Sequence, residues 1–93
     1  MRNPWVILTV DVEHDWGRAT TRSLQFLRGL FDFLDDGDYS ATLFVQGELA
    51  EKVAETGVPK QAEVASHSMS HMNLRKATEN QLVEELRHGA VLL

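Results

Sequence analysis

Residues 63–71 read Glu-Val-Ala-Ser-His-Ser-Met-Ser-His, an apolar run that ends in two histidines, His67 and His71. A second apolar run, residues 5–10, leads into the acidic residues Asp11, Glu13 and Asp15. Short apolar runs of this kind predict buried strands, and chemistry in parallel α/β folds gathers at the carboxyl ends of the strands. We therefore predict one site built from two strand ends, with the rest of the chain as its scaffold.

Strand and helix patterns alternate on either side of this stretch. Strands are expected at residues 5–10, 40–45 and 61–66, the first of them buried on both faces. Gly57 and Pro59 mark the turn before the third strand. Each strand is followed by a helical pattern, and this order predicts an α/β fold in which three β/α units share a parallel sheet with right-handed crossovers.

The three helical patterns have recognisable ends. The first can be capped by Thr20 or Thr21 and stops at residues 35–38, where Gly37 is the expected left-handed residue. The second covers residues 48–55, and the third begins at a capping box made by Thr78 and Gln81. Apolar residues recur at helical spacing in the first pattern (Leu24, Leu27, Phe31, Leu34), in the second (Leu49, Val53) and in the third (Leu82, Val83, Leu86, Ala90).

Length and composition limit the class of protein. The 93 residues suit one domain, and 43% hydrophobic with 25% charged residues is a globular composition. The net charge of -5 argues against a nucleic-acid partner, because phosphate binding requires a basic face. The chain has no cysteine, no apolar run near the roughly 20 residues that span a bilayer, and no signal-peptide pattern. We therefore expect no membrane span and a cytoplasmic location by default.

The two histidines and the three acids offer metal and acid–base chemistry. Imidazole nitrogen is a good ligand for zinc and related ions, although two histidines also occur as ordinary surface or capping residues. Asp11, Glu13 and Asp15 alternate, so they share one side of an extended chain. One acid could complete a metal site and another could act as a general base, whereas the alternative is that they solvate a turn or cap the helix near Thr20. The two clusters together favour a site.

The remaining chemically interesting residues are weaker candidates. Trp5 is expected in the core. Trp16 fits equally well as part of the wall of a substrate pocket or as a residue of structural packing. His14 alternates with the acids and should point away from them, and His88 should be exposed on its helix.

Three pieces of the chain, in order, resemble the polysaccharide deacetylases (NodB homology domain, carbohydrate esterase family 4). Residues 8–11, Leu-Thr-Val-Asp, resemble the first motif, usually Thr-Phe-Asp-Asp. Residues 41–47, Ala-Thr-Leu-Phe-Val-Gln-Gly, resemble the second-strand pattern Ala-Thr-Phe-Phe-Val-x-Gly. Residues 67–74 resemble the His-Ser/Thr-x-x-His motif and the loop that follows it. The resemblance extends over nearly the whole chain.

The resemblance implies a distorted (β/α) barrel that removes N- or O-acetyl groups from carbohydrate with a divalent metal, for which zinc is the expected ion. Asp11 would be the catalytic base, and His67 and His71 would be metal ligands. The family's third ligand is an acid directly after the base, but this chain has Val12 there. Glu13 is the first choice for that ligand and Asp15 the second, and Trp16 is a candidate for substrate binding.

The chain departs from the family in length as well. Family domains are about twice as long, in keeping with the 200 or more residues of most (β/α) barrels. The later motifs, which include an arginine-containing strand, an Asp-Trp stretch and a late histidine that serves as general acid, are missing. We therefore expect residues 1–93 to form the N-terminal part of such a domain, with an uncovered barrel edge that invites self-association.

Three alternatives remain open at this point. The chain could be a non-catalytic remnant that binds metal or carbohydrate. It could be a structural or interaction domain in which the histidine and acid clusters only stabilise turns. It could also be a hydrolase of other non-peptide C–N bonds on the same barrel.

Overall fold

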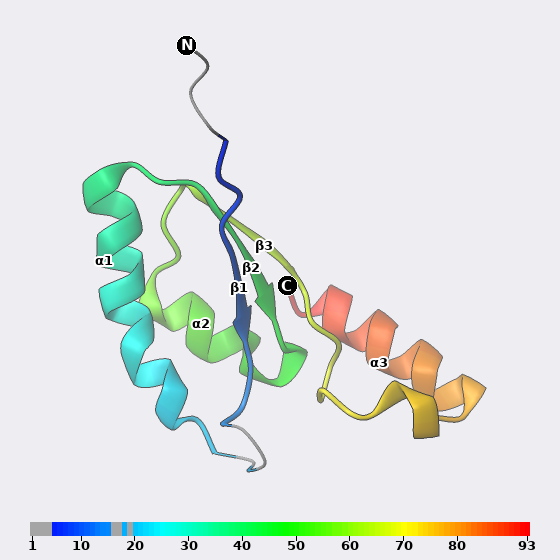
Figure 1. Ribbon diagram of the computed structural model, residues 1–93. Coiled ribbons are helices and arrows are strands. Elements are labelled where there is room, and N and C mark those ends of the chain that lie inside the picture. The colour runs from blue at the N-terminus through cyan, green and yellow to red at the C-terminus, as the bar shows by residue number, and fades with distance from the viewer. Residues whose placement is uncertain (1–4, 16–17, 19) are drawn as a thin grey trace.

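The computed structural model describes residues 5–15, 18 and 20–93, and Figure 1 shows the arrangement of their helices and strands. Three strands form one parallel sheet in the order β1-β2-β3: β1 (Thr9–Val12), β2 (Ala41–Val45) and β3 (Ala62–Ser66). Three α-helices alternate with them: α1 (Leu27–Gly37), α2 (Ala50–Thr56) and α3 (Glu79–Val91). Short 3-10 helices precede these α-helices, namely η1 (Arg22–Phe26), η2 (Gly47–Leu49) and η3 (Leu74–Lys76). The predicted α/β fold with three β/α units is confirmed.

The core lies between one face of the sheet and helices α1 and α2. Leu43 and Val45 on β2 are fully buried there, and Phe31 and Leu34 of α1 pack against the same cluster with Val53 of α2. The period of two along β2 places Thr42 and Phe44 on the opposite face. Sequential parallel strands with both connecting helices on one face are the arrangement of a (β/α) barrel segment, and the other sheet face corresponds to the barrel interior.

The first strand begins later than residues 5–10 predict. Trp5, Val6 and Ile7 are exposed, so the prediction of a strand buried on both faces, with Trp5 in the core, is wrong. The pairing register explains the difference. Thr9 faces Thr42 and β2 begins at Ala41, so residues 5–7 extend past the end of the neighbouring strand.

Helix α1 ends one residue later than expected. The left-handed residue is Asp38, with φ of 52°, and Gly37 is still helical. The Tyr39 ring lies against Gly37 so closely that a Cβ atom there would overlap it. A larger residue at position 37 would require the Tyr39 side chain to move, and Gly37 does not act here through a positive φ.

Helix α3 starts at the predicted capping box, in which Thr78 and Gln81 exchange hydrogen bonds. Its apolar residues Leu82, Val83 and Leu86 nevertheless remain 36–51% exposed, which contradicts the helix face that their spacing predicts. The buried residues of α3 are Glu85 and Gly89. None of the helices that the structure describes is long and apolar enough to cross a membrane.

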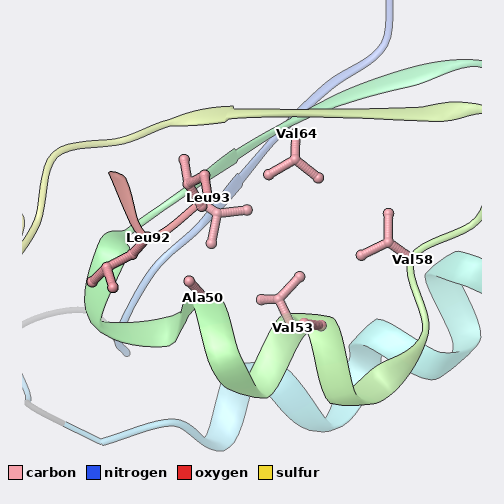
Figure 2. Close-up of a pocket in the computed structure, with 8 residues that line it drawn as sticks. Ala50, Val53, Val58, Val64, Leu92 and Leu93 are labelled. Atoms are coloured by element: carbon pink, nitrogen blue, oxygen red, sulfur yellow. The ribbon is translucent and has the colours of Figure 1, made fainter. Parts of the chain in front are cut away.

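An apolar pocket of about 320 Å³ lies between α2, the sheet and the end of the chain (Figure 2). Val53, Val58 and Val64 line it, and Leu92 and Leu93 close one side. The pocket offers no ionisable group, so we assign it to incomplete packing of the helical layer against β3.

Candidate metal centre

Glu13, His67 and His71 come together at the carboxyl end of the sheet. Glu13 directly follows β1, and His67 directly follows β3. One carboxylate oxygen, Oε2 of Glu13, lies 2.6 Å from Nε2 of His67 and 2.8 Å from Nε2 of His71. The two rings are tilted, with centroids 4.7 Å apart. The predicted meeting of two strand ends therefore occurs, and it joins two ring nitrogens and one carboxylate.

The loop between the two histidines has an unusual backbone. Ser68 and His71 have positive φ angles of 58° and 59°, although neither is glycine. Such a conformation costs about 1–2 kcal/mol per residue and persists where neighbouring groups hold it in place. One such contact is local, since the His71 N–H donates to Oγ of Ser68 at 3.1 Å. The serine of the His-Ser-x-x-His motif thus stabilises the turn that returns the second histidine toward the first.

The start of η2 holds the other side of this loop. The N–H of Gly47 donates to the Ser68 carbonyl at 2.8 Å, and the N–H of Glu48 donates to the Met69 carbonyl at 3.0 Å. A Cβ at Gly47 would lie 2.8 Å from Sδ of Met69 and 3.0 Å from Cα of Gly89, so only glycine permits this approach. His67 itself is fixed by the strand ladder, because its N–H donates to the Val45 carbonyl.

Asp15 lies outside the cluster and has a different set of partners. Its carboxylate accepts hydrogen bonds from the Thr20 hydroxyl and from the backbone N–H groups of Arg22 and Ser23 at the start of η1. The Thr20 hydroxyl and the Ser23 N–H are the main reasons why the pKa of Asp15 falls from 3.8 to about 2. Of the two candidate acidic ligands, the structure brings Glu13 to the histidines and engages Asp15 as a helix cap.

Asp11 lies on β1, beside Phe44 of β2 and on the sheet face opposite the buried Val12. This is the face that the helices leave uncovered, and the Asp11 carboxylate is exposed on it. The expected alternation of Asp11 and Glu13 to one side fits this placement, since the intervening residue Val12 is in the core. Asp11 is thus accessible from the open face of the sheet.

Gln46 is a site residue that the sequence analysis did not single out. It is completely buried, its Oε1 accepts from the His14 N–H, and its Nε2 contacts Nδ1 of His14 at 2.8 Å. The backbone N–H of Gln46 also donates to the Val12 carbonyl. Gln46 therefore ties the segment that carries Glu13 to the end of β2, and the His14 ring contacts Gln46. The sequence signal that could have identified Gln46 is its position as a polar residue at the end of an apolar strand.

Three other expectations concern residues outside the cluster. His88 is 61% exposed and pairs with Glu84 at 3.0 Å, as its helix face predicted. Trp5 is 97% exposed, so it does not lie in the core as expected. Trp16, the candidate for substrate binding, lies outside the residues that the structure describes.

The donor set of the cluster suits a divalent ion. The three ligand atoms all lie within 4.8 Å of one another, and they are two imidazole nitrogens and a carboxylate oxygen. Catalytic zinc sites use this combination and leave a further coordination position open. All three side chains are partly exposed, so an ion and a substrate would both have access.

One of the comparisons with known proteins identifies a family for the chain. A family model described as polysaccharide deacetylase matches residues 2–90. Comparison with curated proteins and with solved structures finds no match. The family match includes both strand ends and the complete loop between His67 and His71.

Proposed function

The chain belongs to the polysaccharide deacetylase family, and on that premise we propose that it serves the metal-dependent removal of acetyl groups from N- or O-acetylated carbohydrate. Glu13, His67 and His71 are the proposed metal ligands, and Asp11 is the proposed catalytic base. The observation that carries the proposal is the contact of one Glu13 oxygen with Nε2 of both histidines, at 2.6 and 2.8 Å.

Zinc is the ion that we propose for this centre. Two histidines and one carboxylate form a borderline ligand set that suits zinc better than magnesium or calcium, which prefer oxygen alone. When bound, the ion supplies Lewis-acid chemistry: it polarises a carbonyl oxygen and makes hydroxide available near neutral pH.

Asp11 takes up the proton of the attacking water. Water oxygen adds to the acetyl carbon, the C–N or C–O bond to the sugar breaks, and the products are acetate and the free amine or hydroxyl of the sugar. The proton released by the water passes to the Asp11 carboxylate, and the leaving amine or hydroxyl takes its proton from the family's general acid, which would come from a later motif. Asp11 suits this role because it lies on the open face of the sheet, two residues before Glu13.

We further propose that the chain supplies the first three β/α units of the family's barrel. Both outer strands, β1 and β3, have one partner each among the described residues, which leaves two edges for further strands or for a second molecule. The general acid of the family would come from a later motif. Residues 11–71 carry the proposed base, Asp11, and the three proposed ligands Glu13, His67 and His71 (the metal triad).

Acetate release tests the proposal. The complete domain, which includes the later family motifs, is loaded with zinc and incubated with a panel of N-acetylated and O-acetylated oligosaccharides, and acetate is measured for the wild type and for Asp11→Asn. We expect Asp11→Asn to lose at least about 100-fold of the acetate release, the scale of a general base, while zinc binding is retained. Near-normal release by Asp11→Asn would remove Asp11 from the role of base.

The same assay separates the alternatives. Zinc binding without acetate release from any sugar would favour a metal- or carbohydrate-binding remnant. Hydrolysis of a small amide, with no acetate from the sugars, would identify a hydrolase of another C–N bond.

A further inference from the structure

Glu85 is a buried carboxylate that the metal triad and the proposed base do not include. It is 8% exposed and lies on α3, where every large apolar side chain is more exposed than it is. A buried carboxylate is costly unless it is hydrogen-bonded. All of its hydrogen-bond donors come from the loop that carries His71.

The hydrogen bonds of Glu85 hold Ser70, the residue directly before His71. Its Oε1 accepts from the backbone N–H of Ser70 at 3.0 Å and from the Ser70 hydroxyl at 2.6 Å. Burial by itself would raise the pKa of Glu85, but the Ser70 hydroxyl, the Ser70 N–H and, more weakly, the Met72 N–H favour the carboxylate and hold its pKa below the ordinary value. Ser70 is therefore fixed by one side chain through both its backbone N–H and its hydroxyl.

The helix backbone reinforces this contact one turn further on. A Cβ at Gly89 would lie 2.8 Å from the carbonyl carbon of Ser68 and 3.0 Å from the N atom of Met69. Helix α3 therefore rests directly on the loop, with Gly89 against its first half and Glu85 bound to its second half. By contrast, the backbone N–H of His67 donates to the Val45 carbonyl of β2 and not to α3.

From this geometry we propose that Glu85 is a positioning residue of the metal centre. It holds Ser70, directly before His71, and thereby keeps the left-handed turn at His71 that brings Nε2 of this histidine to Glu13 and His67. The inference rests on the proposed function, since it requires that the triad binds a metal. Groups that orient metal ligands typically contribute about 10- to 100-fold to metal affinity.

Zinc affinity of variants tests the role of Glu85. We expect Glu85→Ala to weaken zinc binding by about 10- to 100-fold, and Glu85→Gln, which keeps an acceptor oxygen for Ser70, to restore a large part of that loss. Glu84→Ala is the matched control. It removes the same charge from the adjacent position of the same helix, but Glu84 is exposed and pairs with His88, so affinity should stay within about twofold of the wild type.

A double-mutant cycle shows whether Glu85 acts through His71. If it does, adding Glu85→Ala to His71→Ala causes no further loss of zinc affinity, and the visible spectrum of bound cobalt(II) in Glu85→Ala resembles that of His71→Ala. A full additional loss in the His71→Ala background would overturn the proposal, as would a wild-type cobalt spectrum in Glu85→Ala. If Glu85→Ala does not fold, Glu85→Gln is compared with Glu84→Gln in the same cycle.

The two proposals fail in different ways. Zinc binding that depends on Glu13, His67 and His71 but not on Glu85 overturns the inference alone. Absence of zinc binding in the wild-type protein overturns the metal centre and the positioning role together.

Discussion

Oε2 of Glu13 lies 2.6 Å from Nε2 of His67, across 54 positions of sequence and two neighbouring strand pairs. The contact exists because Glu13 and His67 each follow the last residue of an outer strand, and because parallel strands end at the same edge of the sheet. The segment after β1 is held by Gln46, and the loop after β3 by Gly47, Glu48 and Glu85. The proposed metal centre is thus a product of the sheet's topology and of the end of its central strand.

Asp15 should prove structural. We expect Asp15→Asn to lower the melting temperature, because the start of η1 loses a charged acceptor for the N–H groups of Arg22 and Ser23. Its zinc affinity, measured by calorimetry, should match that of the wild type. A loss of zinc binding as large as that of Glu13→Gln would show that Asp15 is the ligand after all.

The contribution of Asp15 should also depend on pH. The pKa of this carboxyl is lowered from 3.8 to about 2 in the folded protein, so its stabilising contribution is fully present above 3.8 and is lost as the pH falls through 2. The difference in melting temperature between the wild type and Asp15→Asn, measured without added metal, should therefore shrink over this interval. A difference that stays constant from neutral pH to pH 2 would contradict this role.

Two glycine-to-alanine changes should have opposite effects. Gly29 lies in α1 with open space around the position of a Cβ, so Gly29→Ala should stabilise the fold by up to about 1 kcal/mol through helix propensity. Gly89→Ala offers the same gain in propensity, but its Cβ would meet the backbone of Ser68 at 2.8 Å. We expect Gly89→Ala to lower the melting temperature and to weaken zinc binding. Equal stabilisation by both changes would show that α3 does not rest on the loop.

Leu43 tests the core beneath the site. It is completely buried on the central strand, and Leu43→Ala should cost about 3 kcal/mol, a large part of the stability expected of so small a domain. Thr42→Ala is the control from the opposite face, where the side chain makes one exposed hydrogen bond to Glu63. Urea unfolding measures both, and similar losses for the two variants would contradict the assignment of the faces.

The sequence predicted the parts of the fold that depend on local pattern. The β/α order, the capping box at Thr78 and the position of His67 at the end of β3 followed from periodicity and end signals. The identity of the acidic ligand did not, because Glu13 and Asp15 alternate in the same way and differ only in what surrounds them. The structure distinguishes the two, because Glu13 contacts both histidines whereas Thr20, Arg22 and Ser23 surround Asp15.

Long-range contacts account for the incorrect predictions. The apolar residues 5–7 were predicted as part of a strand, but strand length is set by the partner, and β2 begins opposite Leu8. Helix α3 carries an apolar spacing, yet the loop after β3 presents N–H donors that require an acceptor, and Glu85 supplies it. A hydrophobic pattern contains no information on that requirement.

The central claim is that Glu13, His67 and His71 form one metal site, and zinc titration by calorimetry tests it most directly. We predict one zinc ion per chain, with affinity reduced by at least about 10-fold in each of Glu13→Gln, His67→Ala and His71→Ala, and unchanged in Asp15→Asn and in His88→Ala, where an exposed histidine is removed from α3. Absence of zinc binding by the wild type, or binding that survives the loss of His67, would contradict the account.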